Sequence, residues 1–211
     1  MAEYVTVTTQ EVAANGNVTF TNTSVKGSNC IQHREGSGII TLRGLTNQCQ
    51  ARFFVDFSGN IALPAGGTVA PISLAIAISG EPVLASEMIS TPAAVSQFNN
   101  VSSGIFISVP RGCCVNIAVE NTSGATIEVA NANLIVNQML TYDLTKTDGP
   151  LYKCLYECIK NDISQGKLSS GEKMPSKRTL AKNLGVSTIT VENAYDQLIG
   201  EGYMFARPKR G

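Results

Sequence analysis

The sequence predicts two domains of different class, an all-β sandwich or jelly roll over residues 1–138 and a mainly α domain over residues 139–211. Three observations predict this division. Apolar residues recur at every second position up to Val136, as in half-buried strands, and at every third or fourth position after Pro150, as on helices. Clusters of Asn, Gly and Ser separate the apolar runs of the first part. The first part has five basic and eight acidic residues, whereas the second has eleven basic and eight acidic ones.

Strands in the first domain are predicted from strict alternation. Apolar residues alternate with small or polar ones over 72–78, 105–109 and 115–119. Successive side chains of a strand point to opposite faces, so each run buries one face. The other face of the first run carries only small residues, which favour close packing against a second subunit and therefore predict an oligomer. These small residues are Ser73, Ala75, Ala77 and Ser79.

Residues that carry catalysis or bind metals are sparse. His33 is the single histidine, so any His-dependent triad or multi-His metal site would have to be built around it alone. Its polar, glycine-rich surroundings predict a surface loop. No Walker phosphate-loop pattern occurs in the chain. We therefore expect that the protein is not an enzyme and holds neither a cofactor nor a metal.

Six cysteines are present, and the N-terminal residues lack the basic and apolar regions of a secretory signal. The longest apolar stretch, 68–79, is too short to span a bilayer. We therefore expect a cytoplasmic protein with mainly reduced thiols and no membrane contact. Cys154 and Cys158 are one helical turn apart, and we interpret them as buried thiols because no His or further Cys lies near them in sequence. The disulfide state of the others stays open. They are Cys30, Cys49, Cys113 and Cys114.

Three helices are predicted in the second domain. Pro150 is suited to a helix start, and Gly166 is placed to end the first helix. Apolar residues four positions apart form one stripe on this helix. They are Leu151, Leu155, Ile159 and Ile163.

The second and third predicted helices begin at serines. Ser176 and Ser187 are suited to cap them, and Gly185 between the helices suits a turn with positive φ. The spacing of the third helix turns Val191, Ala194, Tyr195 and Leu198 inward and leaves Ile189, Asn193 and Asp196 on the opposite side. A short helix, a glycine-containing turn and an amphipathic second helix are the geometry that places the second helix in a DNA major groove.

A family resemblance rests on these same residues. The motif runs through Gly171-Glu172-Lys173-Met174-Pro175-Ser176-Lys177-Arg178-Thr179-Leu180-Ala181, Leu184-Gly185-Val186-Ser187, Thr190-Val191, Ala194-Tyr195, Leu198 and Glu201-Gly202-Tyr203. It resembles the winged helix-turn-helix domain of the GntR transcription regulators, and the Ala-Tyr pair is similar to their MocR-like branch. Residues 1–138 resemble, by pattern alone, small jelly-roll proteins of prophages and Firmicutes and the trimeric heads of the tumour-necrosis-factor and complement type. That second resemblance implies a homotrimer that binds or displays something without catalysis.

The GntR resemblance implies a set of residues that contact double-stranded DNA, at the starts of the second and third helices and in the wing. They are Ser176, Lys177, Arg178, Ser187, Thr188, Thr190, Asn193, Arg207, Lys209 and Arg210. The chain departs from the family pattern at Thr188 and Glu192, where many relatives carry arginine, so the operator sequence does not transfer. The chain also stops at Gly211, where relatives continue into the second strand of the wing, so we expect a wing that is cut short.

Two functional hypotheses follow. The first is a sequence-specific DNA-binding transcription regulator of GntR type, fused to an oligomerising β domain. The second is a structural or surface-binding trimeric jelly-roll protein in which the helical part is incidental or engineered. The order of the domains is unusual, since a GntR domain normally precedes its partner. A natural fusion, two joined reading frames and an engineered chimera are all consistent with that order.

Overall fold

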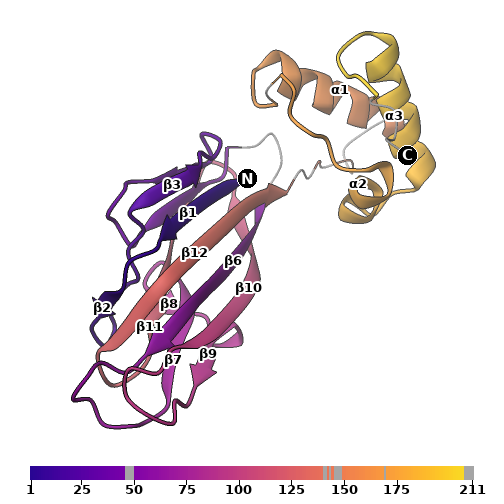
Figure 1. Ribbon diagram of the computed structural model, residues 1–211. Coiled ribbons are helices and arrows are strands. Elements are labelled where there is room, and N and C mark those ends of the chain that lie inside the picture. Colours follow the sequence, from indigo (N-terminus) through magenta and orange to yellow (C-terminus); the bar gives the residue numbers. More distant parts are fainter. Residues whose placement is uncertain (46–49, 140–141, 143, 145–148, 169, 207–211) are drawn as a thin grey trace, which may run out of the picture. The chain divides into compact units, whose positions relative to one another are not determined.

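The computed structural model describes residues 1–45, 50–139, 142, 144, 149–168 and 170–206 (Figure 1). The described residues form two compact units, which divide after Met139. Strands make up the first unit, and the second contains three helices. The expected fold class, an all-β sandwich followed by a mainly α domain, is confirmed. No described helix is long and apolar enough to cross a membrane.

One layer of the β unit is an antiparallel sheet dominated by three long strands, which run side by side in Figure 1. Across the sheet its strands are β10 (Asn99–Pro110), β6 (Gln50–Ala62), β12 (Ile127–Met139), β1 (Ala2–Thr6) and β3 (Asn22–Val25), and β2 (Gln10–Val12) also pairs with β12. The register places Phe106 of β10 opposite Phe54 of β6. Both side chains therefore lie on the same face of the sheet.

The other layer is a second antiparallel sheet of shorter strands. Its order is β4 (Ile31–His33), β5 (Ile40–Arg43), β11 (Cys114–Asn121), β7 (Ile72–Ile78) and β8 (Glu81–Pro82), and β9 (Met88–Ser90) also pairs with β7. The strand runs predicted from alternation lie within β7, β10 and β11. Apolar side chains from both sheets, including Phe53 and Phe57 of β6 and Leu42 of β5, are fully buried in one core between the layers.

Strand β7 differs from the expectation for its small residues. Ala75 and Ala77 are 0% and 1% exposed, and Ser73 is also buried, so both faces of β7 are covered. The cover comes from the chain itself: the backbone N–H of Ile76 donates to the buried Ser86 hydroxyl (2.9 Å), and η1 (Leu84–Ser86) contacts β7. The prediction that Ser73, Ala75 and Ala77 pack against a second subunit is therefore wrong, whereas Ser79, which follows β7, is exposed.

The helical unit consists of α1 (Leu151–Ser164), α2 (Lys177–Leu184) and α3 (Thr188–Gly200) around a core of its own. The inward residues predicted for α3 are all buried, and so are Leu155 and Ile159 of α1, whereas Leu151 is 42% exposed. The core also includes Tyr142 and Leu144, which precede α1. The helical fold therefore begins before the first helix, three residues after β12 ends.

Candidate nucleic-acid interface

Helices α2 and α3 contact each other and are joined by a tight turn. Gly185 ends α2 in the left-handed region at φ 67°, a conformation that only glycine adopts readily. The backbone N–H of Val186 then donates to the carbonyl of Ala181 (3.1 Å), which closes the end of α2. The turn predicted at Gly185 is confirmed, and with it the helix-turn-helix geometry.

Both helices begin at a serine cap, as predicted. The Ser176 hydroxyl accepts a hydrogen bond from the backbone N–H of Thr179 (3.1 Å), and the Ser187 hydroxyl accepts one from that of Thr190 (3.2 Å). Each cap satisfies one of the amides that the first turn of a helix leaves without an intrahelical partner. The remaining amides of the first turns give each helix start a partial positive charge, which favours a phosphate.

Tyr195 connects α3 to the segment before α2. Its ring is buried against the helical core, and its hydroxyl donates to the carbonyl of Pro175 (3.0 Å), one residue before the Ser176 cap. Burial raises the pKa of Tyr195 to about 12, so the hydroxyl remains a donor at neutral pH. This contact fixes the start of α2 relative to α3, which is the geometry that a two-helix DNA interface requires.

Lys177, the first residue of α2, is held by two carboxylates of α3. Its Nζ lies 2.8 Å from Oε1 of Glu192 and 3.3 Å from Oδ1 of Asp196. The hydrogen bond from Lys177 to Glu192 is the main reason why the pKa of Lys177 is raised, and Asp196 adds to it. The GntR resemblance implies that Lys177 contacts DNA, but the structure pairs its charge with the carboxylates of Glu192 and Asp196.

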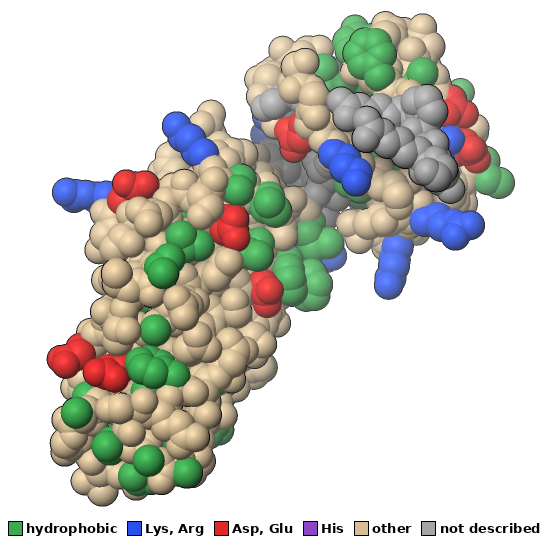
Figure 2. All heavy atoms as spheres, viewed as in Figure 1, with side chains coloured by type: hydrophobic (Ala, Val, Ile, Leu, Met, Phe, Trp, Pro, Cys, Tyr) green, Lys and Arg blue, Asp and Glu red, His purple; other side chains and the backbone are tan. Residues whose placement is uncertain are grey.

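Other basic side chains around α2 are exposed: Lys173 before the helix, and Arg178 and Lys182 on it. On the face shown in Figure 2, basic side chains project from the helical unit and also from one end of the β unit, whose surface is otherwise mostly uncharged and polar with scattered acidic and apolar side chains.

A polar cluster joins α1 to the end of α3. The Tyr156 hydroxyl donates to Glu201 and accepts from Lys160 (2.7 Å), and Lys160 Nζ also lies 5.2 Å from the ring centroid of Tyr203. The hydrogen bond from Tyr156 is the largest cause of the lowered pKa of Glu201. The cluster fixes the segment that leaves α3. Sequence reasoning missed it, since only the i, i+4 spacing of Tyr156 and Lys160 is a local signal.

The structure brings together most of the residues predicted to contact DNA. Ser176, Arg178, Ser187, Thr188 and Asn193 are exposed, and Thr190 is half-buried behind its cap. All of them lie on α2, α3 or the capping positions. The three predicted wing residues lie outside the described residues. They are Arg207, Lys209 and Arg210.

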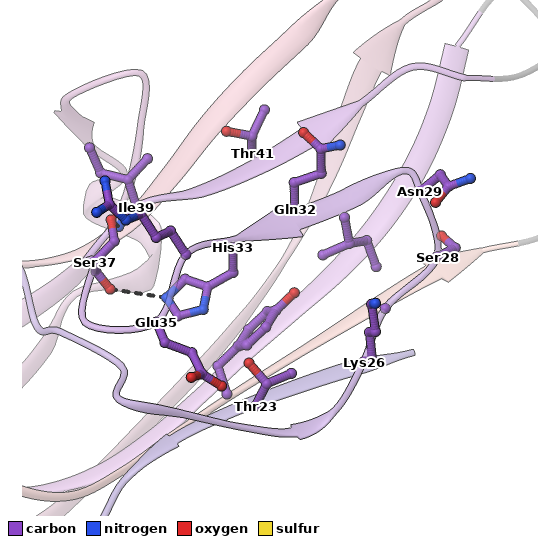
Figure 3. Close-up of a pocket in the computed structure, with 14 residues that line it drawn as sticks. Thr23, Lys26, Ser28, Asn29, Gln32, His33, Glu35, Ser37, Ile39 and Thr41 are labelled. Atoms are coloured by element: carbon purple, nitrogen blue, oxygen red, sulfur yellow. Dashed lines mark hydrogen bonds between the residues drawn. The ribbon is translucent and has the colours of Figure 1, made fainter.

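The β unit has an open groove of about 840 Å³ beside β4, with His33 in its lining (Figure 3). His33 ends β4, and its ring lies 4.5 Å from that of Tyr4, so the expected surface loop is wrong. The Ser37 carbonyl accepts from Nε2 of His33 (3.0 Å), and Nδ1 is buried without a partner. The histidine therefore has a structural role: its ring packs against a core aromatic ring, and its hydrogen bond holds the loop after β4.

Within the described part of the chain, no group of three or more His, Cys, Asp or Glu side chains is placed to hold a metal. Five of the cysteines are free: Cys30 is buried, Cys113 and Cys114 are exposed, and Cys154 and Cys158 are half-buried. The last two were expected to be buried. Cys49 lies outside the described residues.

Comparisons with known proteins agree with the geometry of the helical unit. Residues 151–211 match the family model described as "Bacterial regulatory proteins, gntR family". The chain is 47% identical over 64 residues to the uncharacterized HTH-type transcriptional regulator YdeL of Bacillus subtilis (strain 168), a match that covers 30% of this chain and 14% of that protein. It is 39% identical over 64 residues to the probable rhizopine catabolism regulatory protein MocR of Rhizobium meliloti, covering 30% and 13%. The chain thus spans about one seventh of the length of these relatives.

Among solved structures, the globular domain of zebrafish complement 1qA protein is similar to this chain with a TM-score of 0.41 and 16% identity, covering 64% of this chain and 94% of that one. The family model matches residues 151–211, and the capped helices, the glycine turn and the Ala-Tyr pair lie within that range. Residues 151–211 therefore carry a helix-turn-helix of the GntR type.

Proposed function

We propose that the protein is a sequence-specific DNA-binding transcription regulator, in which the helical unit binds duplex DNA and the β unit joins copies of the chain. The observation that carries the first part is the shared exposure of two capped helix starts, Ser176 with Arg178 and Ser187 with Thr188, beside a glycine turn. The match of residues 151–211 to bacterial regulatory proteins supports the same function. Because bacterial chromosomal DNA lies in the cytoplasm, we propose a cytoplasmic location.

Arg178 is the residue that we expect to contribute most to DNA binding. It is exposed in the first turn of α2, where the partial positive charge of the helix start adds to that of the guanidinium. A planar guanidinium with five N–H donors suits a phosphate or a guanine edge. Ser176 and Ser187 are expected to act through the amides they orient, and Thr188, Thr190 and Asn193 through the groove.

The test is a fluorescence-anisotropy titration of the full chain with random-sequence duplex DNA at several salt concentrations. We expect binding at low salt that weakens linearly on a log-log plot, and a slope about 0.9 smaller for Arg178→Ala because one phosphate contact is lost. Lys153→Ala, which removes an exposed charge from α1, is the matched control. Absence of binding at low salt would overturn the proposal, and an unchanged affinity together with an unchanged slope for Arg178→Ala would remove that residue from the interface.

Self-association is proposed to use the aromatic pair on the long-stranded sheet. Phe106 is 71% exposed on β10, and its ring lies 4.9 Å from that of Phe54 on β6. Burying a phenylalanine side chain contributes roughly 1.5–3 kcal/mol, so an exposed ring beside a second ring favours a partner surface. A second copy of the chain supplies such a surface by symmetry. The homotrimer expected from the sequence stays a prediction.

Native mass spectrometry of the full chain tests this part. We expect an oligomer for the wild type and a monomer for Phe106→Ser. The control is Leu84→Ser, which removes an apolar side chain that is 76% exposed on η1, outside the two strands that carry the pair. A wild-type monomer at micromolar concentration contradicts self-association. A stable oligomer without DNA affinity instead supports the second hypothesis, a structural or surface-binding assembly.

A further inference from the structure

Helix α3 carries an isoleucine whose side chain does not pack in the helical core. Ile189 is 67% exposed, whereas the core-facing residues of α3 are at most 5% exposed. A β-branched side chain gives no advantage in helix propensity at an exposed position. A single exposed apolar residue is common on protein surfaces, so the position and the neighbours of Ile189 must carry the argument.

The position of Ile189 is the second residue of α3, beside the Ser187 cap. In helix-turn-helix proteins the N-terminal residues of the second helix contact base edges in the major groove. Asn193 follows four residues later and is also exposed, so both side chains share one face of the helix. An apolar side chain contacts the C5-methyl group of thymine, and asparagine forms two hydrogen bonds with the N6 and N7 atoms of adenine.

Arginine and lysine are the usual partners of guanine, and α3 contains neither. Glutamate and aspartate accept from the N4 amine of cytosine, but the carboxylates of Glu192 and Asp196 are both paired with Nζ of Lys177 on α2, at 2.8 Å and 3.3 Å. Thr188, the remaining exposed residue of the first turn, also offers a methyl group to thymine.

We propose that α3 reads A·T base pairs in the major groove, with Ile189 contacting a thymine methyl group and Asn193 contacting adenine. This inference rests on the proposed DNA binding by the helical unit and adds its base preference. Any guanine contact then comes from outside α3, with Arg178 of α2 as the exposed arginine nearest to it in sequence among the described residues.

The experiment begins with in vitro selection of duplex sites from a random library by the full chain. Each thymine of the selected site is then replaced by deoxyuridine, which removes only the C5-methyl group. At one thymine we expect the wild type to bind about fourfold more weakly after replacement, from the free energy of burying one methyl-sized group. Ile189→Ala is expected to bind the two DNAs equally. Ile199→Ala, at the other end of α3, is the matched control and keeps the wild-type ratio.

Asn193 is tested by replacing the adenine of the selected site with guanine, one position at a time. We expect the wild type to discriminate by roughly 5- to 150-fold at one position, and Asn193→Ala to lose that preference. The inference is overturned if DNA is bound but no thymine methyl group affects affinity, if Ile189→Ala keeps the thymine-to-uracil ratio, or if G·C pairs are selected where α3 binds. Absence of any bound duplex contradicts the proposed function instead.

Discussion

Replacing Lys177 tests whether this lysine binds DNA or instead neutralises two carboxylates of α3. Its Nζ holds Glu192 at 2.8 Å and Asp196 at 3.3 Å, and the three side chains are 36%, 48% and 61% exposed. Such exposed pairs contribute little to the stability of a fold, because solvent screens them. We therefore expect Lys177→Gln to leave the helical unit folded, with its two carboxylates released.

The released carboxylates are expected to weaken DNA binding. At a separation of about 10 Å from a phosphate in water, each costs about 0.4 kcal/mol before screening, so two cost about 0.8 kcal/mol, or roughly fourfold in affinity at low salt. Salt screens this repulsion, so the difference in affinity between Lys177→Gln and the wild type should shrink as the salt concentration rises. The assay is the anisotropy titration of the full chain at several salt concentrations.

A triple variant separates the two roles of Lys177. Lys177→Gln combined with Glu192→Gln and Asp196→Asn removes the lysine together with the charges it covers, so we expect affinity at least equal to that of the wild type. Lys182→Gln, at an exposed lysine of the same helix, is the control. Removal of the two carboxylates is not expected to restore the DNA affinity that this control variant loses. The reasoning is refuted if Lys177→Gln binds as tightly as the wild type at low salt, or if the triple variant binds as weakly as the single one.

Three further predictions concern stability. Gly185→Ala should lower the free energy of unfolding of the helical unit by about 1 kcal/mol in urea denaturation, because alanine is strained at φ 67°. Tyr142→Ala should lower it by about 3 kcal/mol, because the ring is buried in the helical core; an unchanged midpoint would remove this residue from the folded unit. Glu201 has a lowered pKa in the folded state, mainly from the Tyr156 hydroxyl, so its contribution is present above the ordinary carboxyl pKa and is lost as the pH falls through the folded one. Thermal melts between about pH 5 and pH 3 should therefore show a smaller loss of stability for Glu201→Gln than for the wild type.

Local signals explain why the helical unit was predictable in detail. The caps at Ser176 and Ser187 and the positive φ at Gly185 depend on residues within one helical turn, and each is found where it was expected. Strand alternation is equally local and placed β7, β10 and β11. The core of α3 follows from one period of 3.6 residues, which the sequence displays without knowledge of any partner.

Contacts between distant residues explain what the sequence did not reveal. Lys177 and Glu192 are fifteen residues apart, and their ion pair depends on how α2 packs on α3. Ala75 and Ala77 have the small size expected of a subunit interface, yet other residues of the same chain cover them. His33 is placed by strand pairing, which a glycine-rich stretch does not indicate. In each case the missing information is which segment lies across from the residue.

The helical unit and the β unit favour assemblies with different numbers of chains. A helix-turn-helix dimer reads two half-sites one helical turn apart, so it suits an assembly with a two-fold axis. A closed three-fold assembly of the β unit presents three helical units but lacks the two-fold axis that paired half-sites require. The oligomer proposed to depend on Phe106 is therefore expected to affect DNA recognition. A dimer predicts paired A·T-containing half-sites in the selected DNA, whereas a trimer predicts single half-sites, each bound by one helical unit.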